Sequence, residues 1–203
     1  MTKILKVDKK YTFSDYFELN YPTEEIIAEF GYQYIFKELQ LPKSTVVNKL
    51  DRLRQTYITK LPFISLSSEM AKREFYIAPL LFELLDYIKA KIDVEYPIDA
   101  GKNLSGTLDY LIKYTQNFLI IEAKKGDLEK GFNQLSIELI ALDKITDTSQ
   151  SFLYGVVTLG DVWRFGVLDR DKKLIQKDMN AYTLLTDLEV ILSVFIGILE
   201  SNQ

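Results

Sequence analysis

The chain has 203 residues, of which 47% are hydrophobic and 27% are charged, with 5 Pro and 9 Gly. This composition is typical of a globular protein, and the length favours one elaborated domain over two independent ones. Cysteine and histidine are both absent, which excludes disulfide scaffolds, thiol nucleophiles, zinc fingers, serine–histidine triads and haem sites with a histidine ligand. Any metal must therefore bind to oxygen ligands, which favours magnesium, manganese or calcium.

Charge is distributed unevenly along the chain. The net charge is −4, but residues 1–66 carry 10 basic and 8 acidic side chains, whereas residues 67–203 carry 15 and 21. The acidic total argues against a general polyanion-binding protein and leaves a local basic surface open. The first ten residues lack the apolar core of a signal peptide, and the most apolar stretch, 190–199, is shorter than the ~18 residues that span a bilayer. We therefore expect a soluble, cytoplasmic protein.

The first third of the chain carries signals for helices. Thr23 and Ser44 can each cap a helix: two glutamates follow Thr23 directly, and apolar residues at helical spacing follow Ser44. We interpret residues 1–66 as a helical N-terminal elaboration of a core formed by residues 67–203.

A longer helix is predicted from about 68 to 90, where apolar residues recur every three or four positions. Pro79 should kink this helix or mark its effective start. Glu74 lies on the same stripe, so its side chain should turn toward the sheet and away from water. The alternative is an interfacial glutamate satisfied by neighbouring basic residues or backbone. The apolar residues of the stripe are Ala78, Leu81, Leu85 and Ile88.

From Ile92 onward the hydrophobic period changes to two, which predicts β-strands. A helix from about 128 to 144 separates the third strand from the fourth, and a last apolar helix is predicted from about 181 to 200. The last helix either completes the core or forms the seam of a homodimer. The expected fold is α/β (α+β) with a mixed sheet: helix, three strands, helix, two strands, flanked by N- and C-terminal helices. The predicted strands are 92–98, 105–113, 117–124, 152–158 and 162–168.

The second and third strands concentrate charge on one face. If the loop between them is formed around residues 114–117, Asp109 lies opposite Glu122, and Lys124 points to the same side. The other side of this hairpin is apolar, as expected of a core face. Its residues are Leu108, Tyr110, Ile112, Leu119, Ile121 and Ala123.

Two directly opposed carboxylates repel each other by roughly 3 kcal/mol at about 5 Å and an effective dielectric constant near 20. A bound divalent cation would reverse the sign of this interaction, and Lys124 could offset much of it without a metal. Spacing alone thus leaves two alternatives open: a metal site, or a solvated sheet face with a cross-strand ion cluster.

Asp109 followed by Glu122-Ala123-Lys124 on a hairpin, between two helices, resembles the PD-(D/E)xK nuclease superfamily with the restriction-endonuclease-like fold. Further segments are similar to the nuclease domain of type I restriction motor subunits. Leu108 replaces the proline that precedes the aspartate in the family pattern, and Glu138 stands where some members place a tyrosine. The similar segments are Arg73 to Leu85, Gly106 to Tyr110, Gln134, and Thr158-Leu159-Gly160-Asp161-Val162-Trp163.

The resemblance implies a metal-dependent phosphodiester hydrolase, namely a DNA endonuclease. Asp109, Glu122 and the carbonyl of Ala123 would bind Mg²⁺ or Mn²⁺, with Glu74 contacting the ion directly or through water. Lys124 would orient or deprotonate the attacking water and stabilise charge on the phosphate, and Gln134 would position water or backbone. The alternative is a nuclease-fold protein that no longer cuts and serves as a nucleic-acid- or protein-binding module.

Two further regions could contact nucleic acid. Lys49 and Arg52 belong to a basic group around one predicted helix that could contact phosphates, although a solvated helix face is an ordinary alternative. Trp163 and Arg164, in a predicted hairpin, could reach a base or a groove. A tryptophan packed on its neighbours is the alternative for Trp163.

Overall fold

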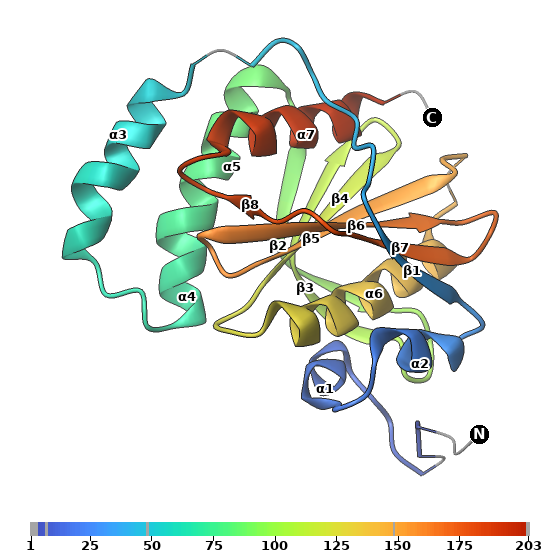
Figure 1. The fold of residues 1–203 in the computed structure, drawn as a ribbon. Helices are drawn as coiled ribbons and strands as arrows, with labels where there is room; N and C mark the ends of the chain where they lie inside the picture. The colour runs from blue at the N-terminus through green and yellow to red at the C-terminus, as the bar shows by residue number, and fades with distance from the viewer. Residues whose placement is uncertain (1–3, 7, 48, 148, 202–203) are drawn as a thin grey trace.

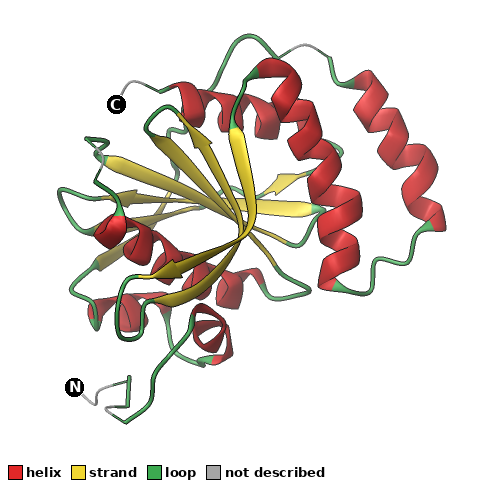
Figure 2. Ribbon diagram, turned by 180° about the vertical axis from the view of Figure 1, so that it is seen from behind, coloured by secondary structure: helices red, strands yellow, loops and turns green. Residues whose placement is uncertain are grey.

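The computed structural model describes residues 4–6, 8–47, 49–147 and 149–201. It shows an eight-stranded mixed sheet with helices on both faces (Figure 1, Figure 2). The strand order is β1-β7-β6-β5-β4-β3-β2, and β8 pairs with β6. The expected mixed α/β class is therefore confirmed. The strands are β1 (Gln33–Lys37), β2 (Lys91–Asp99), β3 (Ser105–Tyr114), β4 (Asn117–Ala123), β5 (Phe152–Thr158), β6 (Val162–Asp169), β7 (Leu174–Asp178) and β8 (Tyr182–Thr183).

The helices form two layers, and each buries its own hydrophobic cluster against the sheet. Helices α3, α5 and α7 cover one face, and α1, α2 and α6 cover the other (Figure 1). Two short helical turns, η1 and η2, adjoin α3 and α5. The helical segments are α1 (Phe13–Glu18), α2 (Thr23–Ala28), α3 (Asp51–Lys60), η1 (Leu61–Phe63), α4 (Glu69–Lys72), η2 (Arg73–Ile77), α5 (Ala78–Tyr87), α6 (Leu128–Ile145) and α7 (Leu188–Glu200).

The five predicted strands and the helix after the third one are confirmed, each within two residues of its predicted ends. The last helix is shorter than predicted, because it begins at Leu188; the predicted first residues form β8 and the turn that follows it. Strand β7 was not predicted. Lys177 and Asp178 are charged, so the sequence does not show the alternation of apolar and polar residues that marks a strand, yet both residues are buried. Among the described helices, none has the length and apolar character needed to cross a membrane.

The N-terminal region differs from the prediction. Strand β1 pairs in parallel with β7, so residues 1–66 contribute a strand to the common sheet and are not wholly helical. Thr23 is the first residue of α2 and not its cap, because Pro22 occupies the cap position. Ser44 caps no helix; its backbone bonds to Ser193 of α7, and α3 begins only at Asp51.

The predicted long helix is present from Glu69 to Tyr87, but a π-helical turn interrupts it at Arg73–Ile77. Pro79 has no backbone N–H to donate to the preceding turn, and the wider turn lies immediately before it. The buried stripe of this helix runs through Ile77, Leu81, Leu84 and Ile88, and Leu85 beside it is 38% exposed. At regular helical spacing Glu74 would lie on the same stripe, but the extra residue of the π-helical turn rotates it away, so it is exposed and the prediction that it turns toward the sheet is wrong.

The register predicted for the β3–β4 hairpin is confirmed, since Tyr110 pairs with Ile121 and Tyr114 with Asn117. Its apolar face packs beneath α5 and α7, with one exception: Leu108 is buried in the opposite cluster. The regular pairing of β3 with β4 ends at Tyr110, the residue that follows Asp109 in the chain. Asp109 therefore lies where the two strands begin to diverge.

Helix α7 is buried along most of its length, so it completes the core, and its apolar face is not free to form a dimer seam.

Helix α7 lies close to the segment before α3 at Gly197. A Cβ atom placed there would lie 2.6 Å from backbone atoms of Pro42 and Lys43. The absence of a side chain at Gly197 therefore allows this segment to cross the helix.

We predict that Gly197→Ala lowers the free energy of unfolding by about 1–3 kcal/mol, because the overpacked contact involves backbone that cannot rotate away. This cost exceeds the gain of about 1 kcal/mol that alanine brings to a helix interior. Chemical denaturation measures the difference. Gly126→Ala is the control, since a Cβ atom there meets nothing within 4 Å. Equal stability of the Gly197→Ala variant and the wild type would contradict the packing described.

Candidate active site

The predicted acidic hairpin residues border one cavity of about 390 Å³ on the face of the sheet covered by α6 and α1. Asp109 and Glu122 come from β3 and β4, Lys124 follows β4, and Gln134 projects from α6. The structure thus brings four of the predicted site residues together. The remaining lining residues are Thr12, Phe13, Ser14, Glu69, Gly106 and Thr107.

Asp109 is held by two different groups. Its Oδ2 accepts a hydrogen bond of 2.8 Å from the backbone N–H of Ala123, which ties β3 to the end of β4. Its Oδ1 lies 3.2 Å from Nη1 of Arg73, which is also 3.3 Å from Glu95. Glu95 has a φ of 53° and interrupts the pairing of β2 with β3 opposite Asp109. Arg73 was not predicted, and it anchors Asp109 from the π-helical turn.

Glu122 is almost fully buried, with 1% of its surface exposed. Its Oε1 accepts hydrogen bonds from Nζ of Lys124 and from Nε2 of Gln134, the latter at 2.5 Å. Its Oε2 is buried and has no hydrogen-bond partner. One oxygen of this carboxylate therefore has no hydrogen-bond donor, in a residue that borders the cavity.

A second buried carboxylate, Glu138, lies behind the first. Nε2 of Gln134 donates to Oε1 of Glu138 at 2.9 Å, so one amide group joins two carboxylates. Oε2 of Glu138 and Oε1 of Gln134 are buried without partners. Glu138 was noticed in the sequence only as a departure from a family pattern. Its spacing of four residues from Gln134 on one helix was the signal that could have placed it in the site.

The proximity of these groups shifts their pKa values. Burial, with repulsion from Glu138 and Asp109, raises the pKa of Glu122 well above its ordinary value. Burial also raises the pKa of Glu138 to about 7. Burial by itself would lower the pKa of Lys124, but the carboxylates of Glu122, Glu138 and Asp109 together outweigh it and the pKa is raised. Lys124 is therefore held as an ammonium group beside the acids.

Close packing of α6 makes this network possible. A Cβ atom at Gly131 would lie 2.6 Å from the side chain of Val157 and 3.0 Å from that of Lys124. Because residue 131 has no side chain, the first turn of α6 lies directly against β5 and Lys124, and Gln134 one turn later reaches Glu122. Nζ of Lys124 also lies 5.5 Å from the ring centre of Phe17 in α1.

Other predicted site residues lie elsewhere. Glu74 is exposed and does not border the cavity; Glu69, one turn earlier, does. Trp163 is fully buried, and its Nε1 donates to the carbonyl of Gly160 at 2.9 Å, so it is not available to a base or groove. The packed alternative for this tryptophan is the one observed.

The three basic candidates for nucleic-acid contact do not form one surface with the cavity. Arg164 is half-buried, and its Nη1 lies 3.6 Å from Glu129 of α6. Lys49 and Arg52 are exposed, but they belong to the layer of α3, on the other face of the sheet.

The donor set fits a divalent cation in part. Within the described ranges, no group of three acidic, histidine or cysteine residues is placed to hold a metal ion. The carboxylates of Asp109 and Glu122 border the cavity as oxygen donors, whereas Ala123 is not among the residues that line it. Oε2 of Glu122 has no hydrogen-bond donor, and a cation or a proton would satisfy it. Water or phosphate oxygens would have to complete the coordination.

Comparison with protein-family models and with curated proteins finds no match for this chain.

The raised pKa of Glu138 predicts a pH-dependent stability. Between the unfolded value of about 4.5 and the folded value of about 7, the folded state holds the extra proton, so this group destabilises the fold progressively as pH rises. Glu138→Gln keeps the acceptor for Gln134 and removes the charge. In the presence of a chelator, we expect the Glu138→Gln variant to be more stable than the wild type. The difference in unfolding free energy should grow from pH 5 to pH 8, by up to about 3 kcal/mol.

Denaturant unfolding at several pH values measures this difference. Glu25→Gln is the control, because Glu25 is an exposed glutamate of α2. A Glu138→Gln gain that is independent of pH would show that Glu138 does not titrate in this range.

Proposed function

We propose that the protein is a metal-dependent phosphodiester hydrolase that cuts DNA, with a site of the PD-(D/E)xK type. The observation that carries the proposal is the convergence of Asp109, Glu122 and Lys124 on one cavity beneath α6. Buried acids with an unpartnered oxygen beside a lysine are an expensive arrangement for a purely structural role.

The order of elements around the site supports the proposal. Helix α5 precedes three antiparallel strands, β2, β3 and β4; helix α6 follows; and β5 returns parallel to β4. This is the helix–three strands–helix–strand order expected of a restriction-endonuclease-like core. The carboxylates lie where β3 and β4 diverge.

In this proposal Asp109, the free oxygen of Glu122 and the carbonyl of Ala123 hold Mg²⁺ or Mn²⁺. When bound, the ion polarises the scissile phosphoryl group and lowers the pKa of a coordinated water. Lys124 donates its N–H groups to the phosphate and stabilises the negative charge that develops there. Gln134 holds the Glu122 carboxylate in place through its amide.

The second candidate function is a nuclease-fold binding module without catalysis. It is favoured by the ion pairs already present, since Arg73 contacts Asp109 and Lys124 contacts Glu122. These pairs offset the repulsion between the acids without a metal. Metal binding and cleavage therefore have to be measured separately.

Metal binding is predicted to raise the melting temperature. A cation bound only by the folded state adds about 2.7 kcal/mol at a hundredfold excess over its Kd. Asp109→Asn keeps an acceptor for the Ala123 N–H but removes a charged ligand, so the shift caused by Mn²⁺ should be lost. Lys124→Ala removes a competing cation and keeps the ligands, so the shift should persist or grow. Differential scanning fluorimetry with and without millimolar Mg²⁺ or Mn²⁺ measures these shifts.

Asp171→Asn, at an exposed aspartate in the β6–β7 turn, is the matched control and should keep the wild-type shift. If neither ion shifts the wild type or Lys124→Ala, the metal site is absent and the binding-module function is left.

Cleavage is predicted to depend on the same residues in a different pattern. On plasmid, single-stranded and branched DNA with Mg²⁺ or Mn²⁺, Asp109→Asn and Lys124→Ala should each lose about a hundredfold or more in rate, the scale expected for one charge-stabilising group. Lys124→Ala should still show the metal-induced melting shift. Lys6→Ala is the control, because Lys6 is an exposed lysine that does not line the cavity. Metal-dependent cleavage that is unchanged in Asp109→Asn would refute the assignment.

A further inference from the structure

Strand β2 lies at the end of the strand order, so one of its edges has no strand partner among the described residues. The second half of this edge is protected against further pairing. Glu95 has a φ of 53°, which breaks the regular strand, and Pro97 has no N–H to donate. The first half, from Lys91 to Val94, pairs regularly with β3 and carries no such protection.

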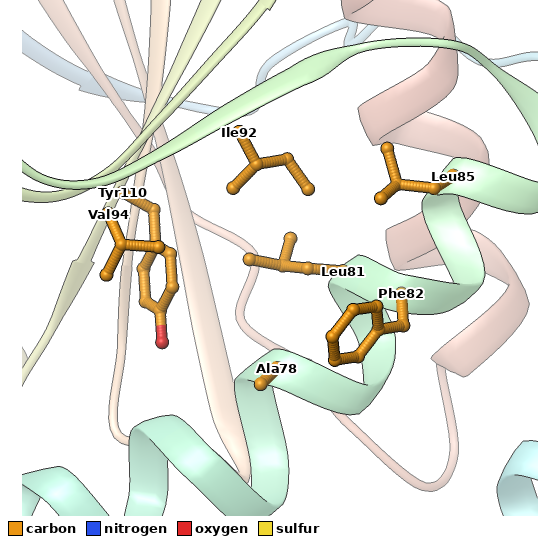
Figure 3. Close-up of a pocket in the computed structure, with 7 residues that line it drawn as sticks. All are labelled: Ala78, Leu81, Phe82, Leu85, Ile92, Val94 and Tyr110. Carbon is orange, nitrogen blue, oxygen red and sulfur yellow. The ribbon is translucent and has the colours of Figure 1, made fainter.

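An apolar groove of about 310 Å³ runs beside this unprotected half, between β2 and α5 (Figure 3). Ile92 and Val94 form its sheet wall, and Leu81 and Leu85 line its helix wall. Phe82 is 73% exposed at its rim, and Val94 is 57% exposed. An exposed apolar groove next to an open strand edge is the pattern of a surface that another chain covers.

We propose that a second copy of this chain covers this surface, by antiparallel pairing of β2 with the partner's β2 about a two-fold axis perpendicular to the sheet. This symmetry places both α5 helices on the same face of a continuous sheet. The exposed Phe82 of each copy is then brought to the junction, where it covers the partner's groove. The proposal concerns the sheet edge and is independent of the proposed nuclease activity.

Charge selects the register of this pairing. A strand pair centred on Lys91 places two lysines opposite each other, and one centred on Asp93 places two aspartates opposite each other; both are unfavourable. Centred on Ile92, the pairing places Lys91 opposite the partner's Asp93. Within one chain, Asp93 already contacts Nζ of Lys91 at 2.9 Å and Nζ of Lys113 at 2.8 Å, so this register adds the partner's Lys91 to an existing ion pair of opposite sign. The Lys91 side chain is 72% exposed and can reach the partner's strand. The edge is thus complementary to itself in one register, which argues for a second copy as the occupant.

The oligomeric state of the full chain tests the proposal. Sedimentation velocity at micromolar concentrations should show a dimer for the wild type and a monomer for Val94→Glu, which places a charge in the joined groove. Val46→Glu is the matched control, since Val46 is also 57% exposed but lies before α3, and this variant should stay dimeric. A monomeric wild type, or a dimer that persists in Val94→Glu, would overturn the proposal.

Cross-linking tests the register, because the chain has no cysteine of its own. Ile92 lies on the proposed axis, so Ile92→Cys should form a disulfide with the partner's residue under mild oxidation, since opposed Cα atoms lie about 4.5–5.5 Å apart. Val94→Cys is the control. The two copies of residue 94 would be about 14 Å apart along the strands and should not link.

A mixture of Lys91→Cys and Asp93→Cys chains provides a second measurement that leaves the groove intact. Cross-linked species should form in the mixture and not with either variant alone, because residue 91 lies opposite the partner's residue 93 and not opposite the partner's residue 91. A dimer that links through residue 94, or that fails to link at Ile92 and in the mixture, would show a different interface and overturn the proposal.

Discussion

The site and the layer above it depend on one interaction, the bond from the Gln134 amide to the buried carboxylates of Glu122 and Glu138. Burying a carboxylate is costly unless it is paired and hydrogen-bonded, and here two carboxylates share one amide while Lys124 donates to Glu122. Three oxygen atoms of this group keep no partner. The apolar core has to offset this cost. A cation or donor in the cavity would remove part of it.

The sheet and α6 are shaped so that this interaction can form. Gly155 and Gly166 leave room for Leu135 and Phe132 of α6, whose side chains would lie 2.7 Å from an added Cβ atom. With Gly131 on the helix side, these positions set α6 close against β4, β5 and β6. Small residues at the helix–sheet contact therefore bring Gln134 within reach of Glu122. The packing of α6 on the sheet therefore also determines the geometry of the site.

Local sequence patterns predicted the elements whose structure depends on residues close to one another in the chain. The β3–β4 hairpin follows from strand alternation and a tight turn, and it correctly placed Asp109 and Glu122 toward one cavity. Glu74 was misplaced because a π-helical turn changes the helical count before Pro79, and periodicity assumes a constant turn. Strands β1 and β7 were missed because a parallel pair between residues far apart leaves no local signal, and the charges of β7 are satisfied by tertiary partners such as Glu129 for Lys177.

The ion pairs around the site also constrain how it could bind a cation. Oδ1 of Asp109 is already in contact with Arg73, and Oε1 of Glu122 with Lys124. A cation that binds both acids must compete with Arg73 and Lys124. The affinity for the cation therefore depends on whether these two side chains find other partners when they are displaced. Arg73 has a second acid within 3.3 Å, Glu95, which can keep its charge paired when Asp109 is engaged elsewhere. The break in β2 at Glu95 thus places a counter-charge where the site needs one, and it links the edge strand to the chemistry of the cavity.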